Sequence, residues 1–179
     1  MFTAFLRDIT ERKQMVGELA FRATHDGLTN MLNSAAFMER LTVAARQANI
    51  GGRSDVAVLF VDLNRFKTIN DEYGHAIGDL LLAAIARRIR TSVRPGDSIA
   101  RLGGDEFGVL LEDVTDEAAV AAVVHRIQSG LNKPFHLSGH QILASASVGT
   151  SLASQHGSRP EDLLRAADAS MYLSKTAGR

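Results

Sequence analysis

The feature of this sequence that most constrains its fold is a run of six apolar residues, Val56–Val61, followed directly by Asp62. Three of the six are valines, and β-branched side chains favour strands. A short continuous apolar run is typical of a strand buried on both faces, so it predicts a central strand of a sheet. Asp62 then stands at the carboxyl end of that strand, where a carboxylate contributes little to packing.

Helical and strand-like segments alternate around this strand. Apolar residues recur at helical spacing in several segments and at every second position in one. The pattern predicts helices over 10–24, 35–48, 75–93, 116–130 and from Pro160 to just before Gly178, and further strands over Ser98–Leu102, Glu106–Leu111 and Ile142–Val148. Asn33 or Ser34 is placed to cap the second helix. Interleaved elements of this kind indicate an α/β sandwich of one sheet with helices packed on it.

Length and composition bound the class of protein. The chain has 179 residues, 45% of them hydrophobic, with 20 basic and 20 acidic residues, which suits one domain with one sizeable core. The balanced charge argues against broad nucleic-acid binding, and the lack of cysteine excludes disulfides and thiolate zinc sites. No apolar run approaches the roughly 18–20 residues that span a bilayer. We therefore expect no nucleic-acid partner, no membrane segment and a cytoplasmic location, although a longer parent protein could be membrane-anchored.

A second acidic group lies in a predicted turn between two strands. Asp105 and Glu106 follow two glycines, so neighbouring carboxylates stand at the tip of a tight hairpin. A divalent cation would relieve their repulsion, and hard oxygen ligands suit Mg²⁺ (or Mn²⁺) held against phosphates. The alternative is a solvated acidic turn. The sequence contains no phosphate-loop, dinucleotide-binding, zinc-protease or nucleophile-elbow motif.

Four segments of the chain resemble one known family in their order and spacing. One of them, Arg101–Phe107, reads RLGGDEF. The others are Asp26–Asn33, Val61–Asp79 and Ala167–Arg179. Together they resemble the bacterial GGDEF family, the diguanylate cyclases, over residues 24–179.

The resemblance implies a fold and a domain boundary. It implies a GGDEF domain over 25–179 with a mostly antiparallel sheet of about five strands flanked by helices, as in nucleotide cyclases and polymerase palms. Residues 1–24 would then be a sensor-domain exit and a linker helix, because residues 5–13 resemble the end of a PAS domain. The helix over 10–24 is either a linker that dimerises or an amphipathic helix lying on the domain.

The resemblance also implies an activity. Members of the family condense two GTP molecules into cyclic di-GMP and release two pyrophosphates. By similarity, Asp62 and Asp105 ligate magnesium with help from the carbonyl group of Leu63. Asp105 and Glu106 would help to remove the proton from the attacking 3′-hydroxyl. One site holds one GTP, so catalysis requires a homodimer in which two sites face each other.

Substrate-binding residues follow from the same similarity. They are Asn70, His75 and Asp79 for the nucleoside and Lys67, Lys175 and Arg179 for the triphosphate. An acceptor such as Asp79 satisfies both N1–H and N2–H₂ of guanine, whereas adenine offers the opposite pattern. Without the resemblance, each of these residues would pass for an ordinary surface or capping residue.

A product-inhibition site is implied next to the hairpin. Arg94 and Asp97 fit the family's R-x-x-D motif, and Arg126 is a candidate for the second arginine of that site. An arginine fork suits the Hoogsteen edge of guanine or a phosphate. The alternatives are a local ion pair between Arg94 and Asp97 and a plain surface arginine at position 126.

One position departs from the family's pattern, since Ser34 stands where an arginine is usual, and this affects local packing or dimer arrangement rather than chemistry.

The leading hypothesis is an active diguanylate cyclase. The second is a catalytically silent module that binds GTP or cyclic di-GMP and regulates a neighbouring domain. The third, a polymerase palm, is disfavoured by the neutral charge and the small size.

Overall fold

The elements of the fold come from a computed structural model that describes residues 15, 17–51 and 55–177. Its helices are α2 (Ser34–Gly51), α3 (Phe66–Tyr73), α4 (His75–Ser92), α5 (Glu117–Leu131), α6 (Ala153–His156) and α7 (Pro160–Ala177). Its strands are β1 (Asp55–Leu63), β2 (Ser98–Gly103), β3 (Glu106–Val114), β4 (Phe135–Leu137), β5 (His140–Ile142) and β6 (Ala146–Leu152).

The main sheet has the order β2-β3-β1-β6, and every neighbouring pair is antiparallel. The apolar run 56–61 therefore forms a central strand, as the sequence predicts. Val58, for example, lies between Leu110 of β3 and Ser151 of β6. The fold class is confirmed as an antiparallel sheet flanked by helices.

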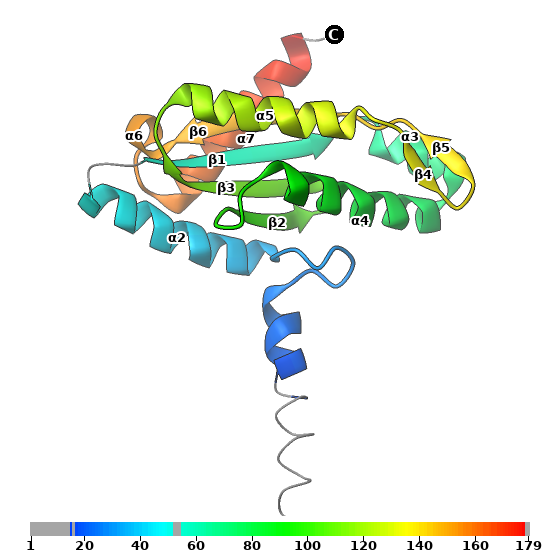
Figure 1. Ribbon diagram of the computed structural model, residues 1–179, viewed down its shortest axis with the longest axis horizontal. Coiled ribbons are helices and arrows are strands. Elements are labelled where there is room, and N and C mark those ends of the chain that lie inside the picture. Colours follow the sequence, from blue (N-terminus) through cyan, green and yellow to red (C-terminus); the bar gives the residue numbers. More distant parts are fainter. Residues whose placement is uncertain (1–14, 16, 52–54, 178–179) are drawn as a thin grey trace, which may run out of the picture.

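Alternate residues of β1 enter two separate cores, one on each face of the sheet. Ala57, Leu59 and Val61 pack with α4 and α5, whereas Val56, Val58 and Phe60 pack with α2 and α7. Figure 1 shows α4 and α5 in front of the sheet and α7 behind it. Burial on both faces explains why the β1 sequence shows no polar alternation.

The main sheet has four strands in the part of the chain that the structure describes, rather than about five. The predicted strand over 142–148 is divided between two sheets. Ile142 ends β5, which pairs only with β4 in a separate hairpin, and Ala146 begins β6. The sequence conceals the break because Ile142 and Ala144 are both buried, which continues the alternation, while Leu143 between them is 70% exposed.

Helix α7 packs directly on β6. A Cβ atom at Gly149 of β6 would overlap the carbonyl oxygen of Ala167 and the amide nitrogen of Met171. Only glycine allows the helix backbone to approach the strand so closely. This contact sets the direction in which α7 carries its last turn towards the end of β1.

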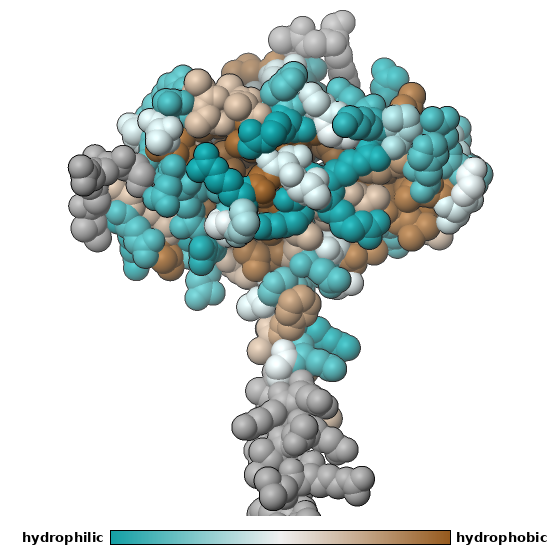
Figure 2. Space-filling model, viewed as in Figure 1, coloured by the Kyte–Doolittle hydropathy of each residue, from teal (hydrophilic) through white to brown (hydrophobic). Residues whose placement is uncertain are grey.

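The chain enters the domain through a short helix that covers residues 17–24. It projects from the body of the molecule (Figure 1), and its Leu19 and Phe21 are exposed, so it does not lie on the domain. Figure 2 shows the same projection with apolar side chains open on its surface. Asn33 then caps α2, since its Oδ1 accepts a hydrogen bond of 2.9 Å from the amide of Ala36.

Among the described residues, no helix is long and apolar enough to cross a bilayer. The segment 5–13 lies outside them.

Candidate functional site

The acidic residues at the end of β1 and at the β2–β3 hairpin lie next to each other. Asp62 stands directly opposite Glu106 in the antiparallel register. Leu63 donates its amide hydrogen to the carbonyl oxygen of Asp105, with 3.3 Å between nitrogen and oxygen. Gly104 makes the hairpin turn with φ of +47°, a backbone conformation that favours glycine. Groups 43 positions apart in the chain (62 and 105) thus share one corner of the sheet.

The electrostatics of this corner show an excess of negative charge. Burial raises the pKa of Glu106, and the carboxylates of Asp62, Asp105 and Asp168 raise it further, while Lys175 acts in the opposite direction. Asp168, for which no role was predicted, acts on this corner from α7. Its position in the closing helix, seven residues before Lys175, is the signal that identifies it, because residues at this spacing share one helix face.

Lys175 balances part of that charge. Its Nζ donates a hydrogen bond of 2.5 Å to Oδ1 of Asp62, and the two side chains are 33% and 16% exposed. The lysine comes from the last turn of α7, the helix that Gly149 allows to pack closely on β6. Arg179, also predicted to meet a triphosphate, lies outside the described residues.

The donor chemistry of this corner fits a hard divalent cation. Asp62, Asp105 and Glu106 offer carboxylate oxygens at one sheet end. Burial and then the neighbouring carboxylates raise the pKa of Glu106, and a cation would remove the part that comes from repulsion. Within the described ranges, no three His, Asp or Glu side chains are grouped so that they alone could hold a metal ion. A cation held here would therefore need further oxygen ligands, such as those of a phosphate or water.

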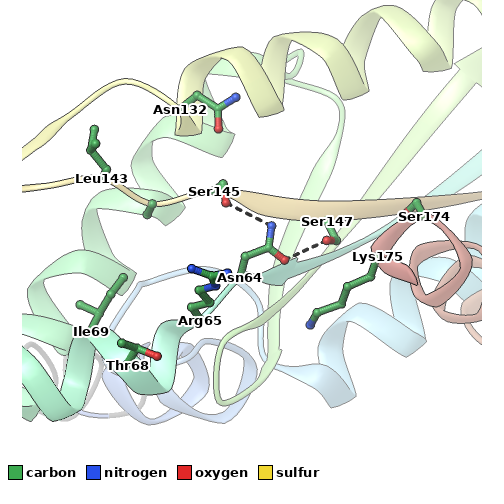
Figure 3. A pocket seen from close by; sticks show the side chains of 11 residues that line it. Asn64, Arg65, Thr68, Ile69, Asn132, Leu143, Ser145, Ser147, Ser174 and Lys175 are labelled. Carbon is green, nitrogen blue, oxygen red and sulfur yellow. Dashed lines mark hydrogen bonds between the residues drawn. The ribbon is translucent and has the colours of Figure 1, made fainter. Parts of the chain in front are cut away.

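Figure 3 shows a cavity of about 730 Å³ that is connected to the acidic corner through Lys175, which lines it and pairs with Asp62. Arg65 and Lys175 are among its lining residues, and none of the described residues that line it is a carboxylate. Asn64 is held between two serines, because its Nδ2 donates to Ser145 Oγ at 3.1 Å and its Oδ1 accepts from Ser147 at 2.9 Å. The basic and hydroxyl groups of the lining suit an anionic ligand. No role was predicted for Asn64 and Arg65, whose signals are that they directly follow β1 and lie within the segment Val61–Asp79.

The predicted nucleoside-binding residues lie on the next two helices. Asn70 belongs to α3, while His75 and Asp79 lie exposed in the first turns of α4. Lys67, also exposed, is the second residue of α3. The structure therefore places these four on one connected helix pair that begins where β1 ends. Their roles remain predictions.

The opening turn of the domain is tied to the acidic hairpin. Nη1 of Arg101 lies 3.2 Å from Oδ2 of Asp26, and Nε of Arg101 donates to the carbonyl oxygen of Gly104 at 2.9 Å. Leu32 extends the connection, since its amide donates to Ile99 at 3.0 Å and its carbonyl accepts from the amide of Arg101 at 2.9 Å. The segment Asp26–Asn33 and the RLGGDEF motif are thus one structural unit.

The predicted inhibitory residues gather around the turn between α4 and β2. Asp97 is 6% exposed, and its Oδ2 accepts a hydrogen bond of 2.8 Å from the backbone amide of Arg94. Arg126 of α5 donates from Nε to the carbonyl oxygen of Ser92 at 3.1 Å. Asp97 therefore shapes the turn through the Arg94 backbone. Arg94 itself is exposed, and Arg126 reaches the same turn from α5.

Comparison with protein families gives one match that spans this whole arrangement. The profile described as "Diguanylate cyclase, GGDEF domain" matches residues 23–179. The chain belongs to the GGDEF family. It is 44% identical over 162 residues to diguanylate cyclase TpbB of Pseudomonas aeruginosa, covering 90% of this chain and 37% of that protein. It thus spans little more than a third of this relative.

Two further proteins similar to this chain are named for different properties. The chain is 36% identical over 172 residues to cyclic di-GMP phosphodiesterase PdeR of Escherichia coli, covering 96% of this chain and 25% of that protein. A crystal structure of the coiled coil and GGDEF domain of DgcB from Caulobacter crescentus in complex with c-di-GMP has a TM-score of 0.88 and 26% identity. The match covers 98% of this chain and 93% of that one.

Proposed function

We propose that this GGDEF domain condenses two GTP molecules into cyclic di-GMP and releases two pyrophosphates. The observation that carries the proposal is the shared corner of Asp62, Asp105 and Glu106, next to a cavity lined by Arg65 and Lys175. Carboxylates beside an anion-binding cavity suit a metal-assisted reaction at a phosphate. Because the substrate is a nucleoside triphosphate, we place the reaction in the cytoplasm.

The carboxylates would have two roles, metal binding and removal of a proton. Asp62 and Asp105, with the carbonyl group of Leu63, would hold magnesium, or manganese in its place. A bound cation would stabilise negative charge on the α-phosphate and the departing pyrophosphate. Glu106 has a raised pKa, which makes it a better proton acceptor than an ordinary carboxylate, so Asp105 and Glu106 would together accept the proton of the 3′-hydroxyl.

Substrate recognition falls to the residues around the cavity and on α3 and α4. Lys67, Lys175 and Arg179 would contact the triphosphate, and Lys175 would exchange its ion pair with Asp62 for phosphate oxygens. Asp79 would accept from guanine N1–H and N2–H₂, with Asn70 and His75 completing the nucleoside site. Because each domain would hold one GTP, formation of both phosphodiester bonds requires a facing copy of the domain, so the productive species is a homodimer.

We also propose that the product, cyclic di-GMP, inhibits the domain by binding at the turn between α4 and β2. Arg94 belongs to the turn between α4 and β2, and Arg126 reaches the start of that turn from α5. Asp97 fixes the shape of the turn through the backbone amide of Arg94. Two guanidinium groups beside a rigid turn would bind a guanine edge or a phosphate of cyclic di-GMP.

The proposal is tested by measuring the conversion of GTP into cyclic di-GMP. Purified protein is incubated with GTP and Mg²⁺, and nucleotides are separated by chromatography. We expect cyclic di-GMP, and Asp105→Ala should lower its yield at least roughly 100-fold. Glu161→Ala is the matched control, because Glu161 is an exposed carboxylate in the first turn of α7. Product that survives Asp105→Ala would contradict the assignment.

A second function is favoured by one finding, the similarity to a protein named as a phosphodiesterase. In that case the domain would bind GTP or cyclic di-GMP without turnover and regulate a neighbouring domain. Tight GTP binding without any product in the same experiment would select this function. Primer-dependent extension would instead indicate a polymerase.

A further inference from the structure

The contact between α3 and α4 contains an unusual polar atom. Oδ1 of Asn70 is buried and has no hydrogen-bond partner among the described residues. It rests against the backbone of Gly78, the fourth residue of α4. A Cβ atom at position 78 would overlap this oxygen and would lie 3.3 Å from Cζ of Phe66. The Asn70 amide thus occupies space that any other residue at position 78 would fill.

The fold itself gives no reason for glycine at this position. Gly78 lies inside a helix and its φ is not among the positive values of the chain. In a helix interior, alanine is more favourable than glycine by roughly 1 kcal/mol. The local backbone would therefore accept alanine, and the nearest neighbours that an added methyl group would meet are the Asn70 amide and the Phe66 ring.

Gly78 leaves open the space in which the Oδ1 end of the Asn70 amide lies. With Oδ1 turned inward against Gly78, the amide nitrogen is the atom left to face a ligand. An amide nitrogen donates hydrogen bonds, and guanine carries acceptors at N3 and O6. Asp79, the next residue on α4, presents the acceptor for the donor groups of the base. Donor and acceptor are thus fixed by two neighbouring residues of one helix turn.

We propose that Gly78 is a positioning residue for nucleobase recognition, which holds the Asn70 amide with its nitrogen directed at guanine. The inference rests on the proposed function, in which Asn70 contacts the nucleoside. Gly78 touches no substrate atom in this account. It acts by having no side chain, so its replacement should disturb GTP binding through Asn70 alone.

The experiment compares four variants of the whole chain. Gly78→Ala should raise the KM for GTP roughly 3- to 10-fold, the value of about one hydrogen bond, with a smaller change in kcat. Its melting temperature should change little, because the helix preference for alanine offsets the cost of displacing the Asn70 amide. Gly130→Ala is the matched control, since a Cβ there lies 3.7 Å from Ser92 Oγ, an ordinary contact. It should leave KM unchanged.

The decisive comparison uses the Asn70→Ala background. There the Gly78→Ala change should add less than about twofold to KM, because the amide that it displaces is already gone. An equal increase in both backgrounds, or no increase in the wild-type background, would overturn the inference. If Gly78→Ala alone does not fold, the double variant should fold, since removal of the Asn70 amide leaves room for the new methyl group, and its failure would also count against the inference. If Asn70→Ala itself leaves KM unchanged, the nucleoside assignment in the proposed function fails instead.

Discussion

At the scale of single residues, charge balance around Asp62 and Glu106 governs the candidate site. Burial and three neighbouring carboxylates favour the neutral form of Glu106, and one lysine opposes them. A raised carboxyl pKa stabilises the fold below the ordinary value of 4.5, and this contribution is lost as the pH rises through the folded-state pKa. A divalent cation would replace the lost contribution at neutral pH.

This balance predicts how magnesium affects stability. Adding Mg²⁺ without nucleotide should raise the melting temperature, and the increase should be larger near pH 7.5 than near pH 5, where protons compete for Glu106. Thermal unfolding followed by circular dichroism measures the shift. Asp105→Asn should abolish it. A shift of equal size in that variant would place the cation elsewhere.

The Asp26–Arg101 pair predicts a second pH effect of opposite sign. Burial alone would raise the pKa of Asp26, but hydrogen bonds from Thr29 and the charge of Arg101 outweigh it and lower the pKa below 3.8. The stabilisation is therefore complete above that value and is lost as the pH falls through the lower folded-state pKa. Asp26→Asn should lower the free energy of unfolding by roughly 1–2 kcal/mol at neutral pH.

The measurement for Asp26 is urea unfolding at several pH values. The difference in stability between wild type and Asp26→Asn should shrink as the pH drops below about 4. A difference that stays constant across this range would show that the charge of Asp26 contributes nothing.

At the scale of elements, the contact of α7 with β6 is the one that delivers Lys175 to the site. Gly149→Ala should destabilise the protein by about 1–3 kcal/mol or more, because the new methyl group meets backbone atoms of Ala167 and Met171, which cannot rotate away. Chemical denaturation measures this loss. Gly130→Ala, a helical position with room for a methyl group, should cost nothing. Equal stability of the two variants would contradict the close packing.

The long elements were predictable because their residues repeat with one period over many positions. Strand β1 and helices α4, α5 and α7 match their predicted ranges to within a few residues. The short elements could not be predicted from the sequence in this way. Helix α3 has eight mostly polar residues, α6 has four, and the three-residue strands β4 and β5 carry too few positions for any periodicity.

At the scale of the whole molecule, one domain offers one acidic corner, whereas the proposed product joins two nucleotides. Specific activity should therefore rise with protein concentration until the dimer is saturated. Excess Asp105→Ala protein should lower the yield per wild-type molecule, because mixed dimers contain one silent site. Activity that is independent of concentration and of added variant would contradict the dimer requirement.

The site was partly predictable from the sequence for a physical reason. A carboxylate at a strand end and two more in a glycine turn are visible as local patterns, and these residues do meet. Contacts between distant segments leave no such pattern. The ion pair of Lys175 with Asp62 joins positions 113 apart, and the fit of Asn70 against Gly78 depends on how two helices pack.

The backbone pairing of Leu32 with Ile99 and Arg101 has a consequence for handling this protein. β2 is an outer strand, and its free amide and carbonyl groups would otherwise be open to pairing with another chain. Leu32 covers part of that border. A truncation that starts after residue 33 would uncover it, and the shortened chain would then tend to aggregate through uncontrolled strand addition.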